Sequence, residues 1–219
     1  MNFRNAEGGR IDRGKPLSFT FDGRTYQGYG GDTLASALLA NGVRVVGRSF
    51  KYHRPRGIFG RGSEEPYALV TIGDGARHEP NIRATQVQLH DGMIAHSQNN
   101  WPSLRWGVAG ILVWLGRCLP AGFYYKTFMW PADLWPKYKQ IIRRTAGMGK
   151  SPTLPDPDVN EKRHAHCDVL VIGAGRAGLA TAQAAASDGD IVWLADEGVV
   201  ENLAGNITLR QHDCFWQIR

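Results

Sequence analysis

The residues best suited to binding chemistry lie between positions 169 and 197, where a glycine-rich turn follows a short apolar run. Residues 169–172 read Val-Leu-Val-Ile, which is too short for a helix and favours a strand buried on both faces. A turn with glycine at its first, third and sixth positions follows directly, at 173–178. In such a turn the first glycine allows a tight bend, the second lets the backbone approach a pyrophosphate, and the third lets a helix lie close to the strand.

The residues after this turn continue the same pattern. An alanine-rich helix is expected over 179–187, with Gly189 ending it, and 191–194 resumes the sheet. Phosphate groups would then meet N–H groups at the positive end of that helix. Asp196, with Glu197 beside it, falls 23 residues after Gly173, where a carboxylate can hydrogen-bond an adenosine ribose.

The order strand, turn, helix, strand and acid predicts a dinucleotide site. Its predicted residues are Gly173, Ala174, Gly175, Arg176, Ala177, Gly178, Asp196 and Glu197. The acid favours NAD or FAD over NADP, because it would repel a 2′-phosphate, but the sequence does not separate NAD from FAD. A glycine turn with a purely structural role is the alternative. Residues 206–215 are expected to add one strand, which does not complete a doubly wound sheet.

Composition and charge narrow the class of protein. The 219 residues are 42% hydrophobic and 21% charged, as in ordinary globular proteins, with a formal charge of +6. Arginines 44, 48, 54, 56 and 61 and Lys51 would suit nucleic acid, an acidic cofactor or an acidic partner, and no nucleic-acid motif accompanies them. The three cysteines lack metal-ligand spacing, and no apolar stretch is long enough for a signal peptide or membrane span. We therefore expect a cytoplasmic protein that binds neither nucleic acid nor membrane.

The N-terminal part has the pattern of a small mixed sheet. Residues 17–26 alternate apolar and polar side chains around Asp22-Gly23, which predicts a β-hairpin. Residues 31–33, Gly-Asp-Thr, offer caps for a helix expected over 34–42, and further strands are expected over 68–72 and 86–89 with a turn at 91–93. A hairpin followed by a helix that crosses a sheet is the beginning of a β-grasp domain.

Two segments separate this domain from the glycine turn. Residues 101–148 hold five of the seven tryptophans, which favours a helical connector that buries large rings, with a partner surface or ligand stacking as alternatives. Residues 151–158 hold three prolines and are expected to form an extended linker.

Several stretches together resemble the α subunit of heterotetrameric sarcosine oxidase. They are Ser-Phe-Lys-Tyr-His-Arg-Pro-Arg-Gly at 49–57, the turn at 91–93, the tryptophan-rich segment, Ile-Arg-Arg-Thr-Ala-Gly-Met-Gly at 142–149, and the glycine turn. Related subunits of hydrogen cyanide synthase and of opine or proline dehydrogenases carry iron–sulfur cysteines. Those places fall at Gly60, Glu65, Ala68 and about Thr85 in this chain, and none supplies a thiolate.

The resemblance implies a subunit that binds NAD, helps to enclose FMN at an interface with a β subunit, and supports oxidation of sarcosine to glycine. FAD and further, smaller subunits would belong to the same complex, and no catalytic residue is expected in this chain. His53 is expected to be structural, and Arg54 and Arg56 to form ion pairs rather than hold phosphate. A fragment of a related amino-acid dehydrogenase, a docking module or a nonfunctional remnant are the alternatives.

The expected fold class is α/β, combining an α+β part with a Rossmann-type part. We expect a ferredoxin-like β-grasp domain without an iron–sulfur cluster at 1–100, an aromatic connector at 101–150, a linker at 151–165, and an incomplete dinucleotide-binding domain at 166–219. Because the resembling α subunits are much longer, the chain is expected to be a truncated or fragmentary subunit, or the product of an internally deleted gene.

Overall fold

The computed structural model describes residues 3–5, 7, 11–49, 53–98, 100, 103–104, 131–159, 164, 166–196 and 207–211. The chain divides into two compact units, Met1–Pro157 and Asp158–Arg219. The predicted connector at 101–150 lies mostly outside the described residues, which include residues 103–104 and its end from residue 131.

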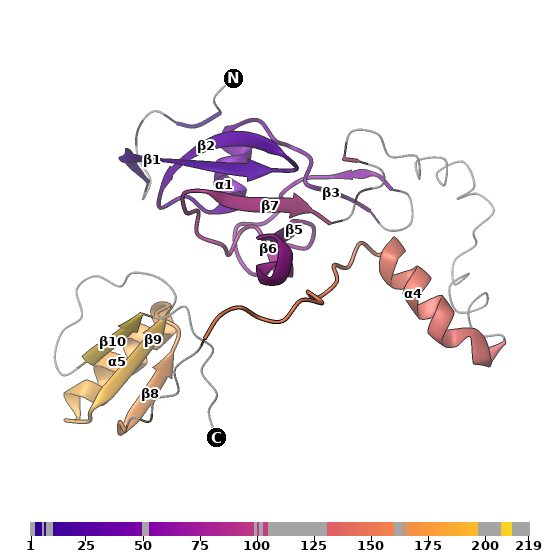
Figure 1. Ribbon diagram of the computed structural model, residues 1–219. Helices are drawn as coiled ribbons and strands as arrows, with labels where there is room; N and C mark the ends of the chain where they lie inside the picture. Colours follow the sequence, from indigo (N-terminus) through magenta and orange to yellow (C-terminus); the bar gives the residue numbers. More distant parts are fainter. Residues whose placement is uncertain are drawn as a thin grey trace. The chain divides into compact units, whose positions relative to one another are not determined.

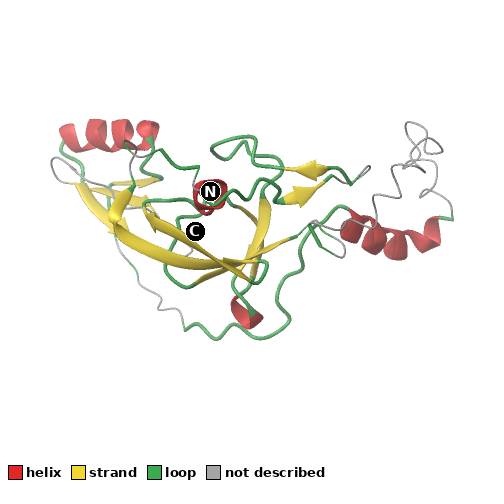
Figure 2. Ribbon diagram, turned by 90° about the horizontal axis from the view of Figure 1, so that it is seen from above, coloured by secondary structure: helices red, strands yellow, loops and turns green. Residues whose placement is uncertain are grey.

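The first unit is built on a five-stranded sheet in the order β2-β1-β7-β5-β6 (Figure 1). Strands β1 and β7 run parallel, and the other neighbours are antiparallel. The strands are β1 (Asp12–Phe21), β2 (Arg24–Gly30), β5 (Leu69–Ile72), β6 (Glu79–Arg83) and β7 (Met93–Ser97). The short strands β3 (Gly47–Arg48) and β4 (Pro55–Arg56) form a separate two-stranded sheet, which Figure 2 shows standing apart from the larger one.

The predicted hairpin is confirmed, since β1 pairs with β2 around Asp22-Gly23. Both turn residues have positive φ, 48° and 74°, which matches the twist of the flanking strands. The strand predicted at 68–72 corresponds to β5, but the strand predicted at 86–89 is wrong. That stretch makes only an isolated bridge between Thr33 and Gln88, because a turn at 83–86 redirects the chain.

Helix α1 (Leu34–Ala40) covers the sheet and supplies much of its core. The Thr33 side chain accepts a hydrogen bond from the Ser36 amide, and the Ser36 hydroxyl accepts one from the Thr33 amide, so the helix begins with a reciprocal cap. Alternate residues of β1 point into the same core. The largest fully buried apolar side chains there are Phe19, Leu34, Leu38, Val46, Val70 and Met93.

The described part of the first unit also contains helix α4 (Trp135–Thr145), preceded by the 3-10 helix η4 (Ala132–Leu134), and a second 3-10 helix, η1 (Gly75–Arg77). The second unit contains parallel strands β8 (Val169–Ile172), β9 (Val192–Asp196) and β10 (Ile207–Gln211), in the order β10-β9-β8, with helix α5 (Arg176–Ser187) between β8 and β9 in sequence. A small core joins α5 to β8 and β9 through Val171, Ala182, Val192 and Leu194. This strand–helix–strand arrangement is the one that the glycine turn predicted.

Candidate dinucleotide-binding site

The glycine turn lies at the carboxyl end of β8, between that strand and α5. Gly173 has φ of +95°, a conformation that side chains other than glycine rarely adopt. Its amide donates to the Ala195 carbonyl at 2.8 Å, which ties the turn to the end of β9. The carboxyl edge of a parallel sheet is where such folds bind ligands.

Gly178 provides the close approach between helix and strand. A Cβ atom added there would lie 1.8 Å from the Gly173 carbonyl oxygen and 3.4 Å from a methyl group of Val171. No side chain fits in that space, so residue 178 has to be glycine for α5 to begin where it does.

Gly175 has the opposite surroundings. It precedes the first residue of α5 with φ of −67°, and a Cβ atom added there would meet nothing within 4 Å. No side chain caps this end of the helix. The first N–H groups of a helix need partners from outside it, and they carry a partial positive charge. The turn is therefore open to an anionic group directly beside these amides.

Asp196 ends β9 next to the turn, as the spacing predicted. Its Oδ2 atom accepts a hydrogen bond from the Ala174 amide at 2.5 Å. Arg176 and Ala177 are exposed at the start of α5. The structure thus brings seven of the eight predicted residues together around one turn, while Glu197 lies outside the described residues. A carboxylate beside uncapped helix amides can bind a ribose hydroxyl next to a pyrophosphate.

The places of the expected cluster ligands lie in and beside the loop at 59–67 of the first unit. Glu65 is 1% exposed, and its carboxylate accepts hydrogen bonds from the amides of Phe59 at 2.7 Å, Tyr67 at 2.9 Å and also Gly60. The Thr85 hydroxyl donates to the Gly62 carbonyl at 2.8 Å, and Ala68 is fully buried. A buried carboxylate therefore organises this loop through its backbone amides.

Replacing Glu65 with glutamine is expected to destabilise the first unit by about 2 kcal/mol, because an amide NH₂ would face backbone donors in a buried site. Urea unfolding of the variant measures this change. Glu64→Gln is the matched control, since the exposed Glu64 carboxylate accepts from the Arg61 and Gly62 amides at 3.0 Å each. The control should unfold at nearly the wild-type urea concentration. Equal midpoints for both variants would show that burial of Glu65 is unimportant.

The described contact of the Arg56 guanidinium is with an aromatic ring, where the sequence suggested an ion pair, and the ion pair expected for Arg54 stays a prediction. The Arg56 guanidinium lies over the Tyr67 ring, 4.7 Å from the centroid. Arg48 donates to the carbonyls of Leu104 and His53. His53 is buried with φ of +51°, and burial, with the Arg48 charge, lowers the pKa of its ring. The structural role expected for His53 stays a prediction.

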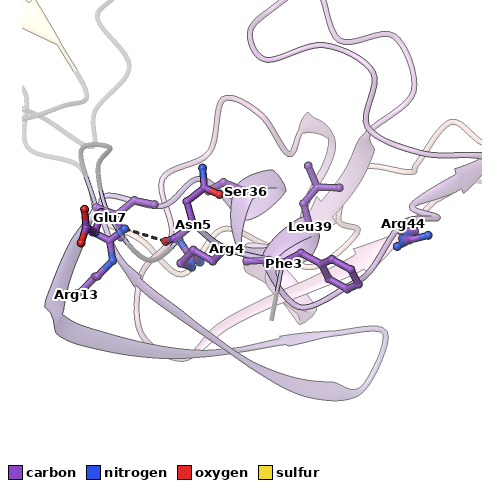
Figure 3. Close-up of a pocket in the computed structure, with 10 residues that line it drawn as sticks. Phe3, Arg4, Asn5, Glu7, Arg13, Ser36, Leu39 and Arg44 are labelled. Carbon is purple, nitrogen blue, oxygen red and sulfur yellow. Dashed lines mark hydrogen bonds between the residues drawn. The ribbon is translucent and has the colours of Figure 1, made fainter. Parts of the chain in front are cut away.

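A hollow of about 490 Å³, which no motif in the sequence indicates, lies beside α1 (Figure 3). Its walls include Phe3, Leu39, Arg13 and Arg44. The Arg44 guanidinium lies 5.1 Å from the centroid of the Phe3 ring, and Arg13 donates to the Asn5 carbonyl, which Figure 3 shows as a dashed line. Both cations thus contact the N-terminal segment itself.

The described part of the chain contains neither a group of metal-binding side chains nor a helix that could span a membrane. Among those residues, no three histidine, cysteine or acidic side chains gather where they could hold a metal ion. None of the described helices has the length and apolar character needed to cross a membrane.

Comparison with protein families corrects one prediction. Residues 14–100 match the family described as 2Fe-2S iron-sulfur cluster binding domain. The match contradicts the expected ferredoxin-like domain without a cluster, and the expected absence of that cofactor, because the family is one that binds it. The prediction rested on four side-chain types at single positions, whereas the match rests on the whole domain.

The side chains present do not themselves fit such a cluster. Residues 14–100 contain no cysteine, and the Glu65 carboxylate already accepts the loop amides. No chemical step is therefore assigned to a cluster in this chain.

Known proteins resemble most of the chain. Sarcosine oxidase subunit alpha of Rhizobium meliloti (strain 1021) is 59% identical over 198 residues, which is 90% of this chain and 20% of that protein. The subunits of the same name from Corynebacterium sp. strains U-96 and P-1 are 36% and 38% identical over 87% and 94% of this chain, and 15% and 17% of their own lengths. The chain thus spans a fifth or less of the length of these relatives.

Among solved structures, the crystal structure of L-proline dehydrogenase from P. horikoshii matches 85% of this chain and 25% of its own, with 21% identity and a TM-score of 0.40. That likeness is too low to support an argument. The sequence identities are much stronger, and they confirm the resemblance that the motifs at 49–57 and 142–149 indicated. The chain is a homologue of the N-terminal part of sarcosine oxidase α subunits.

Proposed function

We propose that the unit Asp158–Arg219 binds the adenosine and pyrophosphate part of NAD. The observation that carries this proposal is the contrast between two glycines of one turn. Gly178 packs so closely against the Gly173 carbonyl that no side chain fits, whereas Gly175 faces open space beside the uncapped start of α5. A turn that only had to fold would need the first feature and not the second.

In this proposal the pyrophosphate lies against the backbone at Gly175, Arg176 and Ala177, where helix amides face it. The exposed Arg176 side chain adds a positive charge near the phosphates. The Asp196 carboxylate accepts hydrogen bonds from the ribose hydroxyls, either in place of its bond from the Ala174 amide or in addition to it. Glu197 is proposed as a second acceptor on sequence position alone. NAD, when bound, would supply a hydride carrier, and these residues would hold its adenosine half.

We further propose that the chain acts within a hetero-oligomeric amino-acid oxidoreductase. Its relatives are named as α subunits of sarcosine oxidase, and the identity reaches 59%. The chain would assemble with a β subunit and smaller subunits, and FMN and FAD of the complex would support oxidation of sarcosine to glycine. The chain would contribute dinucleotide binding and a scaffold, with no catalytic residue of its own. A cytoplasmic location remains a prediction.

The domain boundaries are also proposals. The division at Pro157 and Asp158 supports a dinucleotide-binding unit that follows the proline-rich linker. The earlier residues would comprise the β-grasp domain at 1–100 and the connector at 101–150.

Thermal unfolding of the chain with NAD, NADP and FAD tests which ligand binds. NAD at a hundred times its Kd should stabilise the second unit by about 2.7 kcal/mol, and NADP should have a smaller effect. Gly189→Ala is a suitable control, because Gly189 has φ of +93° at the far end of α5. That variant should lose stability and keep the NAD-induced increase in Tm. Stabilisation by FAD alone would reassign the turn to a flavin, and no stabilisation by any dinucleotide would contradict the proposal.

A further inference from the structure

The chain that leaves α4 is tied to the β-grasp sheet at one junction, formed by His78, Asn81, Gln98, Gly149 and Lys150. His78 follows η1 and Asn81 lies within β6 (Figure 1). Gly149 and Lys150 are about seventy residues further along the chain. Contacts this distant in sequence fix the path of the segment that runs into the linker.

One half of the junction is uncharged. The Asn81 side-chain oxygen accepts from the Gly149 amide and from the Gln98 side chain, both at 2.9 Å. The Asn81 amide donates to the Gln98 side-chain oxygen at 2.7 Å. Asn81 has φ of +64°, a strained conformation for a residue other than glycine, and these bonds hold it there.

The fit around Gly149 is close. A Cβ atom added at Gly149 would lie 2.4 Å from the Pro80 Cβ atom and 2.5 Å from the Gln98 side-chain nitrogen. The Arg143 guanidinium of α4 donates to the Gly149 carbonyl at 2.7 Å. Gly149 thus connects the end of α4 to Asn81 of β6.

The other half of the junction depends on protonation. The two ring nitrogens of His78 lie 2.8 Å from the Gly75 carbonyl oxygen and 2.7 Å from the Lys150 carbonyl oxygen. A neutral imidazole has one N–H group and can donate to only one of these oxygens. The imidazolium ion has two, so only the charged ring satisfies both acceptors.

We propose that His78 and Asn81 form a pH-dependent latch, which holds Gly149 and Lys150 against β6 when His78 is protonated and loosens when His78 becomes neutral. The hydrogen bond between Asn81 and Gly149 does not depend on pH. The hydrogen bond between His78 and Lys150 varies with the protonation of the His78 ring. The latch would control how firmly the segment after α4 is fixed to the first unit.

The charges around His78 favour this behaviour. The bonds to Lys150 and Gly75 raise the pKa of the ring above its usual value, desolvation opposes this increase, and the Asp74 carboxylate adds a smaller effect that raises the pKa. Asp74 also faces His96, with 3.0 Å between its Oδ1 atom and the His96 Nε2 atom. Arg77 and Glu79 flank His78 with opposite charges, and the cations of Arg143 and Lys150 lie on the attached segment.

The sign of the pH effect follows from the direction of this shift. A pKa raised on folding adds stability that is fully present below the unfolded value of about 6.5. That stability disappears as the pH rises through the folded pKa. The attachment should therefore be firm in mildly acidic solution and weaker above neutrality.

Hydrogen exchange of the full chain tests the latch. At pH 6 the amides at 149–151 should exchange at least threefold more slowly than at pH 8, after correction for intrinsic exchange rates. His78→Gln should abolish this difference and exchange at the wild-type pH 8 rate at both values. Asn81→Ala should exchange faster than the wild type at both values. His90→Gln is the control, since the one hydrogen bond that the His90 ring makes among the described residues is with the adjacent Asp91 carbonyl.

Two outcomes would overturn the latch. One is equal protection of the wild type at the two pH values, and the other is a pH dependence that persists in His78→Gln. Titration of the His78 ring by NMR gives an independent measure, with a pKa above 6.5 expected. A value at or below 6.5 would also contradict the proposal. The substituted residues all belong to the first unit, and the dinucleotide site belongs to the second. The result for the latch is therefore independent of the result for the proposed function.

Discussion

Replacing Gly178 with alanine is expected to unfold the second unit, at a cost of about 3 kcal/mol or more. The new methyl group would lie 1.8 Å from the Gly173 carbonyl oxygen, so α5 would have to move away from β8. Its small core, which includes Val171 and Ala182, would separate as a result. Hydrogen exchange of the β8 and β9 amides measures the loss, since these amides lose protection when the unit opens.

Gly175→Ala is the matched control, because it adds the same methyl group three residues earlier in the same turn. Gly175 has φ of −67°, which alanine adopts readily, and the methyl group would contact nothing. Protection of β8 and β9 should therefore remain. If Gly178→Ala kept the same protection, the close packing of α5 against the turn would be refuted.

Replacing Asp32 with alanine is expected to cost about 4 kcal/mol in the first unit, because it leaves a charged partner uncompensated in a mostly buried position. The Arg4 guanidinium donates to both carboxylate oxygens, at 2.9 and 2.7 Å. The Ser36 hydroxyl and the Tyr29 amide donate to the same group, at 2.6 and 3.0 Å. Asp32 thus joins the N-terminal segment, β2 and α1.

The stabilisation by Asp32 should depend on pH. Burial acts to raise the pKa of this carboxyl, but the hydrogen bonds from Arg4, Ser36 and Tyr29 outweigh it and the net pKa is lowered. A lowered pKa adds stability that is present above the unfolded value of about 3.9 and is lost as the pH falls through the folded value. The urea concentration at the unfolding midpoint should be much lower for Asp32→Ala than for the wild type at pH 7, and this difference should become smaller below pH 4.

Asp91→Ala serves as the control for that experiment. The exposed Asp91 carboxylate accepts one hydrogen bond, from the Ser18 amide at 2.8 Å. Its removal should shift the urea midpoint only slightly. A difference between Asp32→Ala and the wild type that stayed constant from pH 7 to pH 3 would contradict the assigned role of the charge.

Local signals in the sequence were sufficient for the elements that they specify directly. Asp22-Gly23 predicted the hairpin because both residues tolerate positive φ. The glycine spacing at 173–178 predicted the turn because Gly173 can adopt positive φ and Gly178 lets α5 lie close to the turn. Strand β6 was missed because its sequence, Glu-Pro-Asn-Ile-Arg, contains proline. Proline is tolerated there because β6 is an edge strand.

Contacts between distant residues could not be predicted in this way. The Arg4–Asp32 pair and the bond between Asn81 and Gly149 join residues 28 and 68 positions apart. No periodicity marks such pairs. Glu65 is a further example, since a glutamate in a polar loop looks solvated in the sequence, whereas here it is buried among backbone amides. The domain without a cluster, which was inferred from four positions that lack cysteine, was wrong, because the family match rests on residues 14–100 as a whole.

The central claim is that the glycine turn binds a dinucleotide, and calorimetric titration of NAD into wild type and Gly175→Ala tests it most directly. The alanine methyl group would occupy the open space where the pyrophosphate approaches the backbone. We predict saturable binding of NAD to the wild type, at least tenfold weaker binding to Gly175→Ala, and the same thermal stability for both chains without ligand. Equal affinity of the two chains, or no binding to either, would contradict the account.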